Sequence, residues 1–409
     1  MHILFLTDNF PPEVNAPASR TYEHAREWVK EGHKVTVITC APNFPKGKVY
    51  KGYKNRIFSR EDLDGINIIR VWTFIMPNSG FFLRVLDYMS FMISSFIASF
   101  NVKKVDIIVA TSPQFFTAVS GYLISKAKNK PWIFELRDIW PESIKAVGAL
   151  SNSFIISLLE KLELFLYRSS SRIIAVTNSF KENLISRGID ENKIDVITNG
   201  VDVSRYKKMN KDAALVAQYN LKDKFICGYI GTHGLAHSLD TIILSAEILM
   251  KKGFQESIHF LFIGNGAKKS ELISLAKEKN VRNITFIDSV KKSDVIRYWS
   301  LLDISLIHLK KSDLFHSVIP SKIFESMAMG IPVLHSVPGE SSEIITRNNI
   351  GICTDPENEV KMADVIIKLF NSENLLTEYS KNSVKSSLKF DRRNLALRML
   401  RILESEVSS

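Results

Sequence analysis

Short apolar segments rich in Ile and Val alternate along this chain with longer segments of helical spacing. Residues 2–7 are such an apolar segment, residues 18–31 carry helical spacing, and residues 34–39 are the next β-branched segment. Gly32 stands between the last two, at the kind of position where helices commonly end. A strand, a helix and a second strand in this order are typical of a parallel crossover. The pattern therefore predicts parallel sheets covered by helices.

The alternation occurs twice, and the segment TNGVD at 198–202 looks like a linker between the two series. In the first series we expect further strands at 66–72, 105–110, 131–136, 172–176 and 194–197, and helices at 84–100, 114–128, 153–168 and 179–187. In the second we expect strands at 225–230, 259–263, 284–287, 304–308 and 332–335, and helices at 238–252, 268–279, 293–302 and 321–329. Helices at 360–371, 373–388 and 391–406 would close the chain. The repetition predicts an α/β protein with two doubly wound domains, residues 1–200 and 201–390.

Composition narrows the class of protein. Hydrophobic residues make up 45% and charged residues 24% of the 409 positions, as in globular proteins rather than disordered ones. The net charge of +11 would suit nucleic acid, an anionic membrane surface or a phosphorylated substrate. Because the basic residues are spread along the chain without a basic tail, we expect no nucleic-acid partner.

The three cysteines, Cys40, Cys227 and Cys353, lie far apart in apolar segments. We therefore expect neither a disulfide framework nor a Cys-based zinc site. We expect instead that the protein works in a reducing compartment. The first residues lack the basic region and cleavage site of a signal peptide. Residues 81–100 are apolar, but their uninterrupted part, 88–100, has only 13 residues, four of them serines. A membrane span needs about 20, so we expect a helix that is buried or lies on a surface.

Ligands of open α/β sheets bind at the carboxyl ends of the strands, which directs attention to the strand-to-helix loops. The loop 8–16 is the first of these, and its small residues would let an anion approach a helix N-terminus, although a structural turn would look the same. It lacks the G-x-G-x-x-G fingerprint of nicotinamide enzymes. The loop after 131–136 begins with Arg137 and Asp138 and continues to Glu142. Arg137 could bind a phosphate and either acid could orient a hydroxyl or act as a base, unless the loop is fixed by an internal ion pair.

Two glycine-rich turns follow strands of the second series, Gly231–Gly234 and Gly264–Gly266. Backbone amides in such turns can hold a phosphate, and the second turn would suit a nucleoside, although neither matches a Walker or Rossmann fingerprint. His233 and His237 are four residues apart without the carboxylate of an HExxH motif, so no metal site is expected.

The strongest local signal is the segment PSKIFESMAMGIPVL at 320–334. Lys322 falls in the first turn of an expected helix, where its charge opposes the helix dipole, so it needs an anionic partner such as a diphosphate. The alternative is a surface ion pair with Glu325, three residues later on the same helical face.

Together these segments resemble the retaining family 4 glycosyltransferases, which have the GT-B fold. The segments TNGVD, GTHG, FIGNG and PSKIFESMAMGIPVL stand in the family's order, so the resemblance runs nearly end to end. ELRDIWPES and GTHGLAHSLDT are most similar to the branch with WbuB-like L-fucosamine transferases of O-antigen synthesis.

The resemblance implies two Rossmann-like domains facing across a cleft, with the acceptor on the first, the donor on the second and the last helix, 391–409, returning to the first. The base of the donor would contact Gly264, Asn265, Gly266 and Val290, and its ribose would contact Glu325. Its diphosphate would contact Gly231, Thr232, His233, Gly234, Ser321 and Lys322. Lys322, Arg137 and Asp138 would be catalytic, and Asn15, Ala16, Trp140 and Glu142 would bind the acceptor.

The sequence departs from the family pattern in four places. Ser317 replaces the first glutamate of E-x7-E, so a sugar contact is in doubt. His233, His237 and Asp240 occupy the region where many members carry an Arg and a Lys. Asn15-Ala16 replaces a double glycine, and Arg137 stands where many members have a histidine.

The implied reaction moves a sugar, such as the N-acetylated deoxyhexosamine L-FucNAc, from a UDP-sugar to a polyprenyl-diphosphate-linked saccharide in O-antigen or capsule synthesis. Lys322 and helix amides would stabilise the leaving UDP, and we expect neither a cofactor nor a metal ion. Since no carboxylate nucleophile is evident, retention would follow a front-face route.

Such an acceptor would place the enzyme in the cytoplasm, peripheral on the inner face of the cell membrane. Residues 81–100 with Lys103 and Lys104 could dock there. Two other interpretations remain open: a UDP-sugar 2-epimerase of the same fold, and a basic nucleic-acid-binding protein without catalytic activity.

Overall fold

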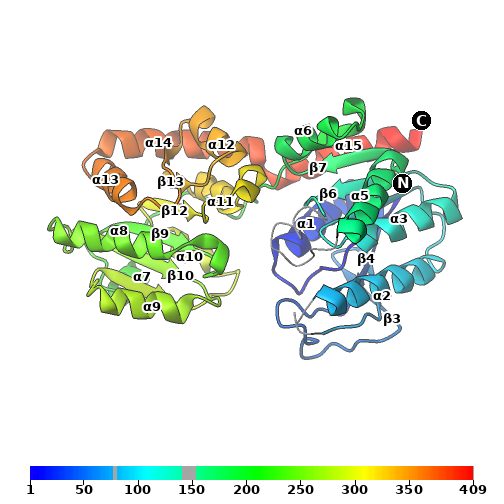
Figure 1. Ribbon diagram of the computed structural model, residues 1–409, viewed down its shortest axis with the longest axis horizontal. Coiled ribbons are helices and arrows are strands. Elements are labelled where there is room, and N and C mark those ends of the chain that lie inside the picture. The colour runs from blue at the N-terminus through cyan, green and yellow to red at the C-terminus, as the bar shows by residue number, and fades with distance from the viewer. Residues whose placement is uncertain (77–80, 141–152, 409) are drawn as a thin grey trace. The chain divides into compact units, whose positions relative to one another are not determined.

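The computed structural model describes residues 1–76, 81–140 and 153–408 (Figure 1). The chain forms two compact units. Unit 1 consists of Met1–Thr198 and Arg392–Ser409, and unit 2 of Asn199–Asp391. These boundaries lie within two residues of those expected from the sequence, and each unit is an α/β layer structure built on one sheet.

The sheet of unit 1 has the order β3-β4-β2-β1-β5-β6-β7-β8. Its strands are β1 (His2–Leu6), β2 (Lys34–Cys40), β3 (Phe58–Leu63), β4 (Ile66–Val71), β5 (Ile107–Thr111), β6 (Trp132–Leu136), β7 (Arg172–Ala175) and β8 (Ile194–Val196). All neighbours are parallel except β3 and β4. Strand β3 is absent from the sequence-based expectation because it is a largely exposed edge strand of sequence FSREDL, which needs no continuous apolar side.

The helices of unit 1 cover both faces of this sheet, and each face has its own apolar cluster. The helices are α1 (Ala16–Lys30), α2 (Phe81–Ser99), α3 (Phe115–Lys128), α5 (Ser153–Ser169), α6 (Asn178–Ser186) and α15 (Arg392–Ser408). No helix in the described ranges has both the length and the hydropathy that crossing a membrane requires.

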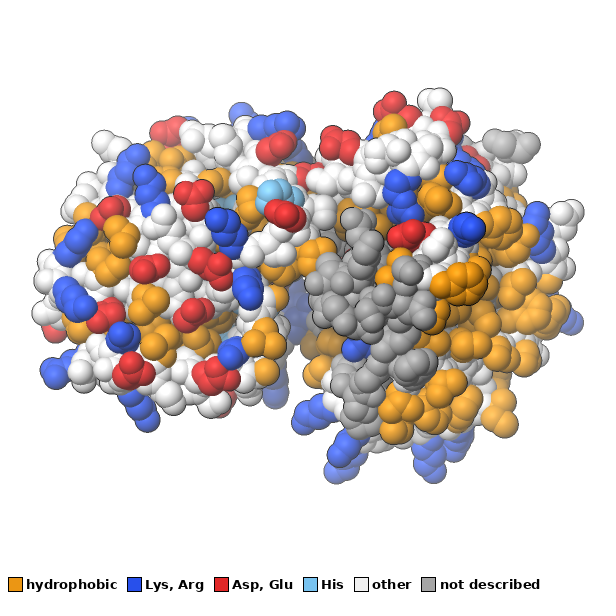
Figure 2. Space-filling view, viewed as in Figure 1, with side chains coloured by type: hydrophobic (Ala, Val, Ile, Leu, Met, Phe, Trp, Pro, Cys, Tyr) orange, Lys and Arg blue, Asp and Glu red, His pale blue; other side chains and the backbone are white. Residues whose placement is uncertain are grey.

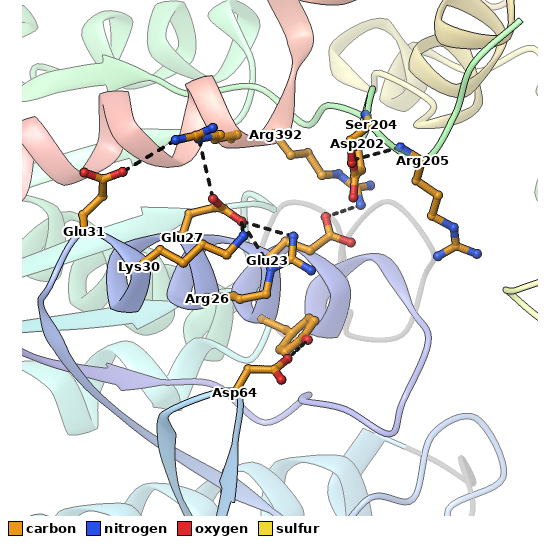
Figure 3. A network of polar contacts seen from close by, with 12 residues as sticks. Glu23, Arg26, Glu27, Lys30, Glu31, Asp64, Asp202, Ser204, Arg205 and Arg392 are labelled. Atoms are coloured by element: carbon orange, nitrogen blue, oxygen red, sulfur yellow. Dashed lines mark hydrogen bonds and ion pairs between the residues drawn. The ribbon is translucent and has the colours of Figure 1, made fainter.

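The C-terminal helix α15 is an integral part of unit 1. Its Leu395, Met399 and Leu403 are buried in the same cluster as Trp28 of α1. The Trp28 indole Nε1 donates to the Ala396 carbonyl oxygen at 2.9 Å. Figure 3 shows the charged rim of this contact, where Arg392 meets Glu23.

The sheet of unit 2 is entirely parallel, with the order β11-β10-β9-β12-β13-β14. Its strands are β9 (Phe225–Ile230), β10 (Ile258–Ile263), β11 (Ile284–Ile287), β12 (Ile304–His308), β13 (Val333–Ser336) and β14 (Gly351–Cys353). The helices are α7 (Ala213–Gln218), α8 (Asp240–Lys251), α9 (Lys269–Glu278), α10 (Val295–Trp299), α11 (Lys322–Met329), α12 (Glu340–Asn348), α13 (Glu359–Phe370) and α14 (Glu373–Ser387). The strand order reverses between β9 and β12, so ligand binding is expected at the carboxyl ends of these strands.

Candidate functional site

The turn after β9 is shaped around one lysine of α11. A Cβ atom on Gly231 would lie 2.2 Å from Cε and 2.5 Å from Nζ of Lys322, so only glycine leaves room for this side chain. The ammonium nitrogen lies 5.0 Å from the centroid of the Tyr229 ring, as in a cation–π contact. The Tyr229 hydroxyl in turn donates to the Thr232 carbonyl oxygen at 2.8 Å, which ties the strand end to the turn.

The turn after β10 interlocks with the turn after β9. A Cβ atom on Gly264 would lie 1.9 Å from the Gly231 carbonyl oxygen, and one on Gly266 would lie 2.3 Å from the His233 carbonyl oxygen. The Gly231 amide donates to the Ile263 carbonyl oxygen at 2.8 Å. The His233 amide donates to the Asn265 carbonyl oxygen at 2.9 Å. The two glycine turns expected to hold the donor therefore form one continuous backbone surface.

The Lys322 ammonium makes no hydrogen bond within the described part of the chain and forms no ion pair with Glu325, whereas its carbonyl oxygen accepts from Ser326 Oγ at 2.8 Å. The structure thus disfavours the surface ion pair that the sequence left open. Burial lowers the pKa of Lys322, and the Glu325 charge partly opposes this. A cation in this position, beside backbone amides at the carboxyl edge of the sheet, is suited to an anion.

His233 contributes to this site by its backbone, because its side chain belongs to the core. The ring is fully buried among Tyr229, Phe262 and Phe286, with centroid distances of 5.9, 6.0 and 6.5 Å. Burial, together with the charges of Lys269 and Lys322, lowers the pKa of His233 to about 4.

The other residues expected around the donor lie on neighbouring loops and on α11. Asn265 is exposed, and its side-chain oxygen accepts from the Gly266 amide at 2.9 Å. Val290 follows β11 and packs against the core of unit 2. Ser321 immediately precedes α11 but makes no capping hydrogen bond with its side chain, and Glu325 lies in the first turn of that helix.

Unit 1 has a cavity of about 310 Å³ at the carboxyl ends of β1, β2 and β5, covered by α2. Its polar lining includes Asp8, Asn15, Arg84, Asp87 and Gln114. Burial, and then the charge of Asp8, raises the pKa of Asp87 to about 7. Burial likewise raises the pKa of Asp8. Asp87 is absent from the sequence-based site, where the available signal was a lone acid in an apolar helical segment.

Arg137 and Asp138 directly follow β6, and both of their backbone amides donate to Ser112 Oγ, at 2.8 and 3.2 Å. The Nε and Nη1 atoms of Arg137 are buried and have no hydrogen-bonding partner among the described residues. Glu135, the acid whose charge acts most strongly on Arg137, accepts instead from Arg20 Nε at 2.8 Å. Burial lowers the pKa of Arg137 to about 10, although Glu135 raises it. The open donors of Arg137 fit a bound anion.

Three of the four residues expected at the acceptor lie in the described part of the chain, and their surroundings differ. Asn15 lines the cavity of unit 1 and also caps α1, accepting from the Ala18 amide at 2.9 Å. Ala16 is the exposed first residue of that helix. Trp140 is buried and stacks on Phe115 at 4.7 Å, which makes it a core residue rather than an open binding surface. Glu142 lies outside the described residues.

In the ranges that the structure describes, no three His, Cys, Asp or Glu side chains gather as metal ligands would. The three cysteines there are free thiols.

Two family models together match most of the chain. Residues 18–205 match Glycosyltransferase Family 4, and residues 212–386 match Glycosyl transferases group 1. WcaI of Escherichia coli, a glycosyl transferase named for colanic acid biosynthesis, is 24% identical over 374 residues, which cover 88% of this chain and 89% of WcaI. CapM of Staphylococcus aureus, named for capsular polysaccharide biosynthesis, is 23% identical over 263 residues, or 62% of this chain and 64% of CapM.

Solved structures show the same two-unit fold. HepE of Anabaena in complex with UDP has a TM-score of 0.73 at 16% identity, covering 99% of this chain and 100% of HepE. WaaG, a glycosyltransferase involved in lipopolysaccharide biosynthesis, has a TM-score of 0.69 at 13% identity, covering 98% and 99%.

Proposed function

The chain belongs to the family 4 glycosyltransferases and has their GT-B fold of two Rossmann-like units, and on this premise we propose that it transfers a sugar from a UDP-sugar to a polyprenyl-diphosphate-linked saccharide. The observation that carries the proposal is the Lys322 ammonium, which has no hydrogen-bonding partner among the described residues and lies against the glycine turn of unit 2. WcaI and CapM are named for surface polysaccharides, and HepE was solved with UDP, which supports a nucleotide-sugar donor and a polysaccharide product.

In this reaction Lys322 and the amides of the Gly231–Gly234 turn bind the diphosphate and stabilise the negative charge of the departing UDP, while the Gly264–Gly266 turn binds the base. Glu325 binds the ribose, and Arg137 and Asp138 act on the acceptor side. The transferred group is an N-acetylated deoxyhexosamine such as L-FucNAc, with retention, in O-antigen or capsule synthesis. The support for this sugar is the similarity of ELRDIWPES and GTHGLAHSLDT to WbuB-like transferases. A UDP-sugar 2-epimerase is less favoured because the matching family models and relatives are named transferases.

The donor site can be tested by calorimetry, with UDP, GDP, ADP and NAD each titrated separately into the wild type. We expect UDP to bind most tightly, and Lys322→Ala to weaken it at least tenfold, as loss of a charge-assisted contact implies. Lys361→Ala, which changes an exposed lysine of α13, is the matched control and should leave the affinity unchanged. Equal binding of all four nucleotides, or UDP binding unaffected by Lys322→Ala, would contradict the placement of the donor.

We also propose that unit 1 binds the membrane surface that carries the acceptor lipid. The outer face of α2 exposes Leu86, Met89, Ile93 and Ile97, each 38–61% accessible, at spacings of three and four residues. Phe154, Leu158 and Phe165 of α5 are also exposed, and Leu123 of α3 lies on the helix between them. Figure 2 shows hydrophobic side chains gathered over the part of unit 1 where Figure 1 labels α2, α3 and α5.

Basic residues border this apolar face at the C-terminal ends of α2 and α3. Phe100 follows α2 and is 57% exposed, with Lys128 Nζ located 5.9 Å from the centroid of its ring. Lys103, Lys104 and Lys126 are nearby in the sequence and are exposed. Apolar side chains beside lysines are the combination that binds to anionic lipid surfaces.

A further inference from the structure

His237 occupies a turn that the sheet of unit 2 holds firmly in place. The short 3₁₀ helix η2 (Leu235–His237) directly follows Gly234. His308 Nδ1 on β12 donates to the His237 carbonyl oxygen at 2.8 Å. The Lys310 amide donates to the Ala236 carbonyl oxygen at 2.9 Å. His308 Nε2 accepts from the Glu357 amide at 3.1 Å, so His308 is a neutral imidazole with its proton on Nδ1. The backbone of η2 is thereby fixed to β12.

The His237 ring returns over the glycine turn, at the end opposite to Lys322. A Cβ atom on Gly234 would lie 3.4 Å from His237 Nδ1, whereas one on Gly231 would lie 2.5 Å from Lys322 Nζ. Both groups contact Tyr229, because the His237 ring stands edge-on to it with centroids 6.0 Å apart. His237 Nδ1 is buried without a hydrogen-bonding partner in the described structure.

The surroundings keep this imidazole uncharged while the site is empty. The titratable groups around it are Tyr229 of β9, His233 of the turn, His308 of β12 and Lys322 of α11. Burial, followed by the charge of Lys322, lowers the pKa of His237 to about 4. A diphosphate bound over the turn would add negative charge beside the ring, which favours the protonated imidazole.

We propose that His237 is a second basic group for the donor diphosphate and that it takes up one proton from solution when the nucleotide binds. This inference rests on the proposed function, because it requires the diphosphate to lie over the Gly231–Gly234 turn. No bond of the donor is made or broken in this step, since a solvent proton is added to the imidazole. The empty site therefore carries one cation and the occupied site carries two.

Proton uptake can be measured directly by titrating UDP into the protein at pH 7 in two buffers of different ionisation enthalpy. We expect uptake by the wild type, and affinity that increases as the pH is lowered. His237→Asn should bind UDP about tenfold more weakly and take up fewer protons. His237→Arg should restore the affinity without restoring the uptake, because arginine is already charged. A merely structural role for the ring would not produce this split.

The matched control is His259→Asn, which removes a half-buried histidine of β10 whose Nε2 lies 2.9 Å from Thr285 Oγ1. This variant should take up as many protons as the wild type. Protons released or bound by UDP itself are common to all four proteins and cancel in the comparison. Equal uptake by wild type, His237→Asn and His237→Arg would overturn the role of His237 while leaving the donor site intact. Absence of UDP binding in all four proteins would instead overturn the proposed function.

Discussion

At the scale of single residues, each unit holds polar groups whose burial is costly unless a ligand is bound. Among the described residues, two buried guanidinium nitrogens of Arg137 in unit 1 and one ring nitrogen of His237 in unit 2 have no hydrogen-bonding partner. Lys322 was predictable from the sequence because a lysine at a helix start is a local pattern. Asp87 was not, because its importance comes from the placement of α2 beside the loop of Asp8, which is far away in sequence.

Asp87 makes the stability of unit 1 dependent on pH in a direction opposite to that of most carboxyl groups. Its pKa of about 7 in the folded protein is above the value of about 3.9 expected in the unfolded chain. The neutral carboxyl therefore stabilises the folded state at low pH, and this contribution is lost as the pH rises from about 4 to 7. We expect the free energy of unfolding of the wild type to fall by about 1 kcal/mol relative to Asp87→Asn between pH 5 and 8, a value reduced because the side chain is partly exposed.

Chemical denaturation of both proteins across this pH range is the measurement. The exposed Asp223→Asn provides the control and should follow the wild type. If the free energy of unfolding of the wild type and of Asp87→Asn changed with pH in the same way, the pKa of Asp87 would not be raised by burial in the folded protein.

At the scale of elements, α2 has three different surroundings. Phe91 and Ala98 are buried against the sheet, Asp87 and Tyr88 line the cavity, and Ile93 faces solvent. The sequence indicated an apolar helix here but could not assign its faces, because apolar residues occur on both sides. The sequence did not predict the polar α12 or the three-residue β14. Neither element has enough apolar residues to show a helical or strand periodicity.

If the outer face of α2 meets lipid, removing its apolar side chains should abolish membrane binding without unfolding the protein. We expect the double variant Ile93→Ser, Ile97→Ser to lose binding to vesicles of phosphatidylglycerol and phosphatidylethanolamine in a flotation assay. Its melting temperature should stay near that of the wild type, because these positions are 52% and 61% exposed. Val360→Ser with Val384→Ser, two exposed apolar positions of unit 2, is the control. Retention of vesicle binding by the α2 variant would exclude this face as the lipid contact.

At the scale of the whole molecule, unit 1 is discontinuous in sequence and unit 2 is not. The two series of strands and helices could be predicted because each repeats a local pattern of strand and helix. That α15 belongs to unit 1 came only from the family resemblance, because nothing in its own sequence says which core it joins. Its buried Leu395, Met399 and Leu403 complete the cluster around Trp28.

Truncation after Asp391 should therefore unfold unit 1 and spare unit 2. Each buried leucine or methionine of α15 contributes about 1.5–3 kcal/mol by leaving water, and several are lost together. Hydrogen exchange should show loss of protection in β1, β2 and β5, with β9, β10 and β12 still protected. Removal of residues 407–409 alone should leave both units protected, because Val407 and Ser408 are exposed. A truncated chain with a fully protected β1 would show that α15 is dispensable.

The discontinuity of unit 1 also has a consequence during synthesis on the ribosome. Residues 199–391 emerge as an uninterrupted stretch. Unit 2 can therefore finish folding before the last helix of unit 1, α15, has been synthesised. Until α15 leaves the exit tunnel, unit 1 stays unfolded, and Trp28 and its apolar neighbours are accessible to chaperones and proteases. A nonsense mutation just after residue 391 would thus disable the half of the molecule that was translated first.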